Sequence, residues 1–403
     1  MKHLLTGILF LVISVAGVWS WLFYRENLRG IGPAVFQASS DAATLISQGK
    51  SPLSYPGEFK LTVFAEGLPG CRVIAFDSRG TMLVSIPSAG KVVALPDGDG
   101  DGRADNIIDV ISGLNRPHGL EFSNDLSRRL YIAETDQVTA YDYDPEKMQV
   151  SAGEKIADLP GGGGHFTRTI LFMPPPDEDK LLISVGSSCN VCAEADWRRA
   201  KILVINKDGG QLQTFASGLR NSVFMRVHPE TKEIWATEMG RDYLGDDLPP
   251  DEINKITHSN DYGWPSCYGK NIPDNEYLSA DDISRACRDK TPSFIDIQAH
   301  SAPLGLDFFP SSGWPERYRN TMLVAFHGSW NRTIPSGYKI ILFRFNEQGK
   351  ELDRRDFITG WLTDDKKSSI GRPVDIRIMP QGLIYISDDK AGVIYQLALK
   401  PNP

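Results

Sequence analysis

Residues 218–254 read GLRNSVFMRVHPETKEIWATEMGRDYLGDDLPPDEIN, and this stretch decides the fold that the sequence predicts. It opens with a polar loop at Arg220 and Asn221, after which apolar residues alternate with polar ones over 223–227. The turn HPETKE leads into a second short strand, IWATE, and then into a loop dense in acids and prolines. Alternation with period two is typical of half-buried strands. A hairpin that only filled a core would not need these polar loops, so we expect a ring of such hairpins around a charged ligand.

The rest of the chain repeats this pattern loosely, giving six copies. In each copy a strand that often ends in Gly-Leu leads through a polar loop into an alternating strand, a turn and a further strand. The alternating strands begin near residues 74, 120, 170, 224, 305 and 375. The earlier spacings are close to the roughly 40–50 residues of a four-stranded propeller blade. We therefore predict an all-β fold, a six-bladed β-propeller, over residues 58–403.

The two ends of the repeat region predict how the ring closes. The last copy ends at VIYQLAL and lacks an outermost strand, whereas FKLTVF at residues 59–64 stands alone before the first copy. We predict that residues 59–64 complete the sixth blade, because closure leaves only short, protected sheet edges. The wider late spacings hold insertions at 242–250 and 262–291.

The N-terminal region is a separate object. Residues 4–23 carry no charge and end in aromatic residues suited to a membrane interface. At about 1.5 Å per residue they would span roughly 30 Å, the thickness of a bilayer core. We predict an uncleaved transmembrane anchor at residues 1–24 and a tether at 25–57, with a cleaved signal peptide as the alternative. The propeller would then be periplasmic or otherwise extracytoplasmic, tethered to the inner membrane by the N-terminal helix.

Composition and charge exclude some partners. Hydrophobic residues make up 41% of the chain and charged residues 23%, as in globular proteins. The 43 Lys and Arg residues face 51 Asp and Glu residues, which gives a formal charge of −8. This balance argues against nucleic acid as a partner and against adsorption to an anionic membrane surface.

Five cysteines fit an exported chain in part. Cys267 and Cys287 are close enough in sequence to close one loop in an oxidising compartment. Cys189 and Cys192 form a C-x-x-C pattern without the histidine of a haem attachment site and without a second pair for zinc. We interpret them as a local disulfide or two buried thiols, and we assign no role to Cys71.

The polar loops of the six copies would converge on one mouth of the central channel. Loops on a rigid scaffold are where binding and catalytic sites are built. Their cationic, imidazole and amide side chains are Arg116, His118, His165, Arg168, Arg220, Asn221, His300 and Arg372. A cationic mouth in an acidic protein predicts an anionic ligand with several carboxylates or phosphates.

Each of these side chains also has a purely structural interpretation. His165 follows four glycines and is either a general base near neutral pH or a hydrogen-bonded loop histidine. Arg220 and Arg372 either grip planar carboxylates or bridge two blades. Asn221 either orients the ligand or caps a turn. The glycines do not form G-x-G-x-x-G, so a nucleotide ligand is not predicted.

Two acidic stretches are candidates for Ca²⁺, a hard ion that takes several oxygen ligands. The first is the loop after Glu238, whose alternative is a solvated insertion. The second, DGDGDG at residues 97–102, copies the opening of an EF-hand loop. Its twelfth position is Ile108, where an EF-hand needs a glutamate, so an ordinary turn is the alternative there.

Several stretches together resemble one enzyme family. GRDYLGDDLPPDEIN, DYGWPSCYG, GGGGHFTRTILF and AFHGSWNRTIPSGYK are similar to the pyrroloquinoline quinone (PQQ)-dependent sugar dehydrogenases of the soluble glucose and sorbosone type, with the sorbosone type fitting better. The resemblance runs from about residue 58 to the end of the chain. It implies a six-bladed propeller with PQQ lying on Ca²⁺ in the mouth.

The resemblance also implies roles for particular residues. His165 is similar to the family's general base, and the main-chain carbonyls of Gly240 and Arg241 resemble its Ca²⁺ ligands. The residues similar to its cofactor contacts, together with two further mouth candidates, are Arg220, Asn221, Arg372, Arg168 and Arg332. The sequence departs from the glucose type at Val374, where that type has a second arginine, and at Met239, where it has a polar residue.

The function expected from this resemblance is a PQQ- and calcium-dependent dehydrogenase. It would oxidise a sugar, sugar aldehyde or related polyol by hydride transfer to the quinone, and an external acceptor would take the electrons. The alternatives are a calcium-dependent, lactonase-like hydrolase and a non-catalytic exported propeller that binds a carbohydrate or protein.

Overall fold

A computed structural model describes residues 14–21, 36–37, 46, 51–123 and 129–401. Six four-stranded antiparallel sheets make up most of it. From inside to outside, the first three are β3 (Ile74–Phe76), β4 (Met82–Ile86), β5 (Lys91–Leu95) and β6 (Ile108–Ser112); β7 (Gly119–Phe122), β8 (Leu130–Ala133), β9 (Gln137–Asp144) and β10 (Gln149–Asp158); and β11 (Ile170–Phe172), β12 (Lys180–Val185), β13 (Lys201–Asn206) and β14 (Gln213–Ser217).

The other three sheets continue the series around the ring. They are β15 (Met225–Val227), β16 (Ile234–Glu238), β17 (Asp251–Ile256) and β20 (Ile295–Ile297); β21 (Pro303–Phe308), β22 (Thr321–Phe326), β23 (Lys339–Phe345) and β24 (Glu351–Ile358); and β26 (Pro373–Met379), β27 (Leu383–Asp388), β28 (Val393–Leu399) and β2 (Phe59–Glu66). The minor elements are β1 (Phe36–Gln37), β18 (Cys267–Tyr268), β19 (Ile272–Pro273), β25 (Ser368–Ser369) and the short helices η2 (Pro87–Ala89) and η3 (Glu316–Tyr318).

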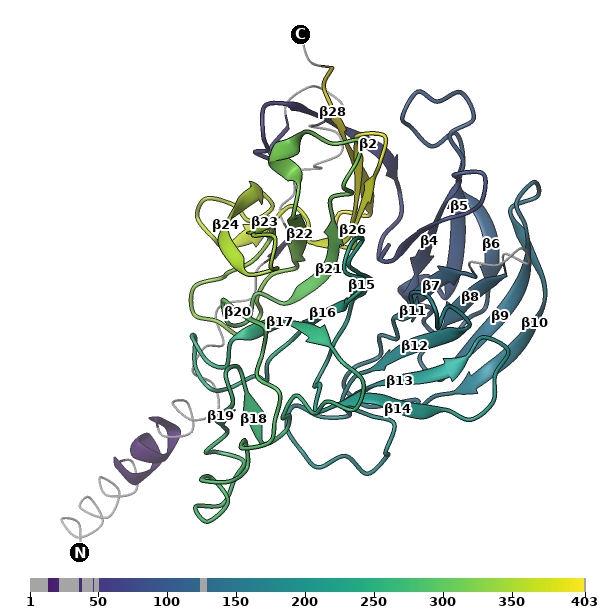
Figure 1. The fold of residues 1–403 in the computed structure, drawn as a ribbon. Coiled ribbons are helices and arrows are strands. Elements are labelled where there is room, and N and C mark those ends of the chain that lie inside the picture. The colour runs from purple at the N-terminus through teal and green to yellow at the C-terminus, as the bar shows by residue number, and fades with distance from the viewer. Residues whose placement is uncertain (1–13, 22–35, 38–45, 47–50, 124–128, 402–403) are drawn as a thin grey trace, which may run out of the picture.

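The six sheets form a closed ring. The innermost strands contact one another in the order β26, β3, β7, β11, β15, β21 and back to β26. Figure 1 shows these strands toward the centre, with β10, β14 and β24 toward the outside. The predicted six-bladed, all-β architecture is confirmed, and each inner strand begins within two residues of its predicted position.

The predicted closure is confirmed as well. Strand β2 pairs antiparallel with β28, Phe59 opposite Leu399 and Val63 opposite Tyr395, so the N-terminal strand is the outermost strand of the last blade. This pairing joins residues more than 300 positions apart. It removes the open edge that β28 would otherwise present to solvent.

Apolar side chains fill the spaces between blades. Trp235 on β16 is almost completely buried, and its indole makes edge contacts with the rings of Phe308 and Phe345 from the next blade and with Phe294. Such aromatic contacts fix the angle between two blades, because rings of this kind pack edge to face. Val374, which replaces the second arginine of the glucose type, lies fully buried in this same core.

The N-terminal anchor is not supported by the described residues. Residues 14–21 are helical, and the other residues of the predicted 4–23 span lie outside the described part of the chain. Among the described residues, no helix is both long enough and apolar enough to cross a membrane. The anchor at 1–24 and the membrane partner stay predictions.

The topology gathers two sets of loops at one end of the ring, which we call the mouth. Because the strands of a blade are antiparallel, the loop that enters the first strand and the loop between the second and third strands lie at the same end. The mouth loops that matter below are residues 159–169, 186–200, 218–224, 239–250, 298–302, 327–338, 359–372 and 389–392.

Candidate functional site

His165 lies in the mouth loop between β10 and β11. Its Nδ1 is 2.9 Å from the Ser187 carbonyl oxygen and 3.0 Å from Ser187 Oγ. A carbonyl only accepts hydrogen bonds, so Nδ1 carries the proton and Nε2 keeps a lone pair. Burial, followed by the positive charge of Arg220, lowers the pKa of His165 to about 3. The imidazole is therefore neutral at pH 7, the state that a general base needs.

Gly186 brings His165 and Asn221 together. A Cβ built on Gly186 would lie 2.6 Å from Asn221 Oδ1 and 2.7 Å from His165 Cβ, closer than real Cβ contacts allow. Only glycine therefore fits between these two side chains. The structure thus places two of the predicted site residues on either side of one backbone position.

The backbone of Asn221 is held by a buried glutamate. Glu238, at the end of β16, accepts hydrogen bonds from the Asn221 backbone N–H (2.7 Å) and from Ser222 Oγ (2.5 Å). Burial raises the pKa of Glu238 to about 8. The Asn221 side-chain Nδ2 lies 3.5 Å from the sulfur of Met239, the residue that departs from the glucose type.

The same support recurs in two other blades. An acid at the end of the second strand accepts a hydrogen bond from the mouth loop of its own blade, as Glu134 does from Asn115 (2.5 Å) and Asp388 from Arg372 (2.7 Å). The sequence carries the pattern as IAE, ATE and ISD. Sequence reasoning missed these positions, although a strand that ends in a buried acid was the available signal.

Arg220 is buried and bound on several sides. Its Nη1 donates to the Gly240 carbonyl (2.9 Å), and its Nη2 forms an ion pair with Asp242 (3.2 Å). Asn190 accepts from Arg220 twice, through its backbone oxygen and its side-chain oxygen, at 2.9 Å each. The Asn190 side chain also holds the backbone N–H and carbonyl of Asp242. Asn190 was not predicted, and it joins the arginine to the acidic loop.

Arg168 has partners that differ from those predicted. It is fully buried, and its guanidinium donates to the carbonyl oxygens of His165 (3.0 Å), Thr167 (2.7 Å) and Pro160 (2.8 Å). Arg199 lies beside it and donates to the carbonyls of Pro160 and of the glycine run. Burial, followed by the charge of Arg199, lowers the pKa of Arg168 to about 9. The contact between Arg168 and a cofactor stays a prediction, and in this structure the side chain supports the loop that carries His165.

The predicted calcium carbonyls lie on a fixed backbone. The Gly240 N–H donates to Asp251 (2.9 Å), and the Arg241 side chain forms a buried ion pair with Asp274 (2.8 Å). Burial raises the pKa of Asp251 to about 7. The acidic loop is thus an ordered element and not a solvated insertion.

The other calcium candidate, at residues 97–102, also brings carboxylates together. Side-chain oxygens of Asp97, Asp99 and Asp101 lie within 4.8 Å of one another. Backbone N–H groups of the same loop donate to all three carboxylates, which is typical of an ordinary tight turn. Calcium binding at this loop stays a prediction.

Arg372 lies on the opposite side of the mouth. Its guanidinium donates to the carbonyls of His327 (3.0 Å) and Gly328. His327 Nε2 is 2.9 Å from Asp389, which also forms an ion pair with Arg72 (2.7 Å). Burial would raise the pKa of Asp389, but His327 and the arginines outweigh it and hold this pKa below its ordinary value.

The Arg332 side chain binds the acidic loop at residues 239–250. It donates to the Asp246 carbonyl and forms an ion pair with Asp247 (2.9 Å). The cofactor contact of Arg332 stays a prediction, and in this structure its donors hold the loop at residues 239–250. Of the other mouth residues, His300 Nε2 lies 2.8 Å from the Gly245 oxygen, and the Arg116 guanidinium lies over the ring of Phe166.

Two disulfides are present. Cys267–Cys287 confirms the expected pairing. Cys189–Cys192 decides between the two interpretations of the C-x-x-C pattern in favour of a local disulfide. The Cys189–Cys192 disulfide closes the loop that carries Asn190, and Cys189 lies two residues after Ser187. The disulfide therefore constrains Ser187, which orients His165, and Asn190, which orients Arg220. Cys71 is free and buried.

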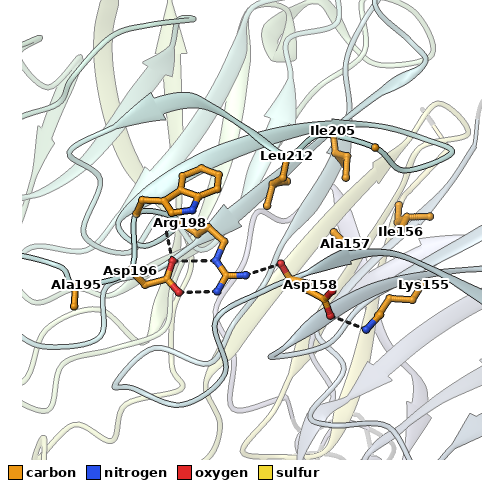
Figure 2. A pocket seen from close by; sticks show the side chains of 11 residues that line it. Lys155, Ile156, Ala157, Asp158, Ala195, Asp196, Arg198, Ile205 and Leu212 are labelled. Atoms are coloured by element: carbon orange, nitrogen blue, oxygen red, sulfur yellow. Dashed lines mark hydrogen bonds and ion pairs between the residues drawn. The ribbon is translucent and has the colours of Figure 1, made fainter.

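A cavity of about 710 Å³ lies between β10 and the third blade, where residues 195–198, at the end of the mouth loop 186–200, line one side of it. Figure 2 shows that its charged groups pair with one another, Arg198 with Asp196 and Lys155 with Asp158. Trp197, Ile205 and Leu212 are among its other lining residues. Its charges are internally satisfied, so it offers no group for acid–base chemistry.

The fold and the mouth define a class of protein: a six-bladed propeller whose mouth carries a neutral histidine among buried arginines. The TrAA12-like family matches residues 53–400 of this chain. The chain belongs to this family, a family of PQQ-dependent sugar oxidoreductases, and the predicted resemblance is confirmed.

Two solved structures share this fold, and one curated relative is similar in sequence. The calcium structure of a Trichoderma reesei protein of carbohydrate-active enzyme family AA12 has a TM-score of 0.77 at 22% identity, over 91% of this chain and 99% of that one. The holo form of the pyranose dehydrogenase PQQ domain from Coprinopsis cinerea has a TM-score of 0.72 at 20% identity, over 86% and 97%. An uncharacterized protein of Borreliella burgdorferi is 29% identical over 86% of this chain and 91% of its own length.

Proposed function

We propose that this chain is a PQQ- and Ca²⁺-dependent dehydrogenase that oxidises a sugar, sugar aldehyde or related polyol and passes the electrons to an external acceptor. The observation that carries the proposal is His165. Its Nδ1–H is held by the Ser187 carbonyl, its Nε2 keeps a lone pair, and its environment holds it neutral. A neutral imidazole with a lone pair on Nε2 is the form that could accept a hydroxyl proton.

The side chains of the mouth fit a tricarboxylate quinone. Arg220 and Arg372 are buried cations, and burial lowers the pKa of both. A desolvated cation gains most from an anionic partner, so carboxylates would be stabilised here. Arg220 and Arg372 would hold the cofactor, with Asn221 beside them.

In this proposal the main-chain carbonyls of Gly240 and Arg241 would bind Ca²⁺. The Gly240 carbonyl already accepts a hydrogen bond from a cation, Arg220, at 2.9 Å. Asp251 accepts a hydrogen bond from the Gly240 N–H, and Asp274 accepts one from the Arg241 side chain. These bonds hold the backbone that carries the two carbonyl groups. Oxygen ligands on a fixed backbone suit Ca²⁺.

The residues of this chain then divide the work. His165 Nε2 would take the proton of the substrate hydroxyl, and Ser187 would keep the imidazole in the right tautomer. Arg168 would position the His165 backbone through its carbonyl contacts. Bound PQQ supplies an electrophilic quinone carbon that accepts hydride, with Ca²⁺ as the Lewis acid.

We also propose that the protein works outside the cytoplasm. Two disulfides form in the described chain, and disulfides persist in oxidising compartments. The N-terminal anchor and the transfer of electrons to an external acceptor are part of this proposal.

The decisive experiment is a titration of the full chain with PQQ, with Ca²⁺ and after chelation, followed by absorbance. Dye reduction is then measured with a panel of aldoses, aldehydes and polyols. We expect Ca²⁺-dependent binding and sugar-dependent dye reduction. The absence of PQQ binding at high Ca²⁺, or hydrolysis of lactones with Ca²⁺ alone, would overturn the proposal in favour of the hydrolase or binding alternatives.

A further inference from the structure

Two aromatic side chains at the mouth have no role in the chemistry described so far. Trp330, on the loop between β22 and β23, is 56% exposed. Tyr243, on the loop between β16 and β17, meets it edge to face, with ring centroids 5.9 Å apart at 88°. We call Trp330 and Tyr243 the aromatic pair. The exposed part of the Trp330 indole, with the Tyr243 ring beside it, offers an apolar surface that a ligand could contact.

The loop that carries Trp330 is held rigid. Tyr338 Oη donates to the Ser329 carbonyl (2.8 Å), and the Ser336 N–H donates to Ser329 Oγ (3.0 Å). The Thr333 N–H donates to the Asp246 side chain (2.8 Å), which ties this loop to the loop of Tyr243. The aromatic pair is thus preformed, and binding would cost little ordering entropy.

Each of the two loops also holds an arginine of the site. The residue before Tyr243 is Asp242, the ion-pair partner of Arg220. Gly328, two residues before Trp330, accepts a hydrogen bond from Arg372. The aromatic pair therefore lies on two mouth loops that also contact the two arginines.

The chemistry around the aromatic pair selects one class of ligand. Tryptophan and tyrosine rings offer a broad apolar face, which matches the C–H face of a pyranose ring. On the same loops, Asp246 accepts a hydrogen bond from the Thr333 N–H and the exposed Asp247 pairs with Arg332. A carboxylate has further lone pairs, which could accept hydrogen bonds from sugar hydroxyl groups, and a sugar carboxylate would lie near their negative charge. A neutral sugar ring satisfies both features, whereas a short aldehyde lacks the apolar face and a sugar acid carries the wrong charge.

We propose that the aromatic pair binds the ring of a neutral pyranose substrate and so determines specificity at this mouth. This inference rests on the proposed function and narrows it, because it prefers neutral pyranoses to sugar acids and to short aldehydes. It assigns Trp330 and Tyr243 as substrate-contacting residues without a part in proton or hydride transfer.

The test compares two tryptophans of nearly equal exposure. Trp330→Ala and Trp197→Ala are made in the full chain, Trp197 being 51% exposed beside the cavity in Figure 2. For Trp330→Ala we expect the KM for a neutral pyranose to rise about tenfold, with kcat and PQQ affinity within about twofold. Trp330→Phe should recover part of the loss, and Trp197→Ala should change nothing.

Sugar binding is also measured without turnover, by saturation-transfer NMR with glucose and glucuronate. We expect a signal from glucose that Trp330→Ala abolishes, and a weaker signal from glucuronate. An unchanged KM and an unchanged NMR signal in Trp330→Ala, or an equal effect of Trp197→Ala, would overturn the inference. A wild-type chain that fails to bind PQQ would instead overturn the proposed function, while the NMR comparison would still decide the role of the aromatic pair.

Discussion

The mouth and the cavity in Figure 2 carry similar side chains in opposite arrangements. In the cavity, Arg198 forks onto Asp196 and Lys155 meets Asp158, all at least partly in contact with solvent. In the mouth, Arg168 and Arg199 are buried, and the hydrogen bonds they donate to the described chain go to carbonyl oxygens. A carbonyl satisfies a donor without cancelling its charge.

This difference teaches why one region is suited to chemistry. Exposed ion pairs are screened by water and contribute about 0–1 kcal/mol each. Burial is the main cause of the lowered pKa of His165, and the positive charge of the nearby arginines lowers it further. Buried cations that face dipoles keep a positive potential, which would stabilise an anion. Perturbed groups of this kind gather at functional sites. The predictions below test whether the mouth differs from the cavity as this contrast requires.

The largest expected effect is on His165. Replacing it with alanine should lower kcat by about 10²–10⁴-fold, because the base that takes the hydroxyl proton is gone. PQQ affinity should stay within a few-fold, since the arginines remain. The measurements are dye reduction and the absorbance titration, with the exposed His258→Ala as the matched control. Retained turnover would show that the base lies elsewhere.

Arg220 should show the next largest effect. Arg220→Ala removes a buried cation, and we expect PQQ affinity to fall about 100-fold, in line with the roughly 2–5 kcal/mol that a buried charged partner is worth. Arg220→Lys should recover little, because a single ammonium cannot replace a guanidinium with bonds to Asn190, Gly240 and Asp242. An Arg220→Ala variant with wild-type affinity would mean that this arginine is purely structural.

How much of this site could be predicted depends on how far apart in the sequence the contacting residues lie. The alternation of apolar and polar residues predicted the strands of the blades. The position of Arg220 at the mouth followed from its place in the loop before an innermost strand. The partners of each arginine in the mouth could not be read from the sequence, because Arg168 and Arg220 occupy similar loops. Only the folded chain shows that Arg168 donates to carbonyl oxygens whereas Arg220 also pairs with Asp242. The ion pair between Arg72 and Asp389 joins positions 317 residues apart, and no local pattern encodes it.

Asn190 is expected to have a moderate effect as a positioning residue. Asn190→Ala should weaken PQQ binding about tenfold, because Arg220 and the Asp242 backbone lose their shared acceptor. Asn190→Asp keeps that acceptor and should lose less. A role in folding alone would lower Tm in both variants without separating their PQQ affinities, so Tm and affinity are measured together.

The depressed pKa of His165 gives a smaller, pH-dependent effect on stability. An unfolded histidine binds a proton below about pH 6.5, whereas the folded one resists it down to about pH 3. The unfolded state therefore binds more protons in this window, and stability falls as the pH drops. Relative to His165→Gln, the cofactor-free wild type should lose up to about 1 kcal/mol per pH unit below pH 6. Denaturant unfolding at pH 7, 6 and 5 measures the difference, and parallel curves would contradict it.

The smallest effect should come from the cavity, and it decides whether the contrast between the two regions is sound. Asp196 is held by Arg198, which lowers its pKa to about 2, yet both side chains are in contact with solvent. Asp196→Asn should therefore change the free energy of unfolding by less than about 0.5 kcal/mol and leave PQQ affinity and kcat unchanged. Denaturant unfolding and dye reduction are compared with those of Arg220→Ala. If Asp196→Asn matched Arg220→Ala in either measurement, burial would not be what separates the mouth from the cavity, because the same kinds of side chain would then act alike in water and beneath the surface.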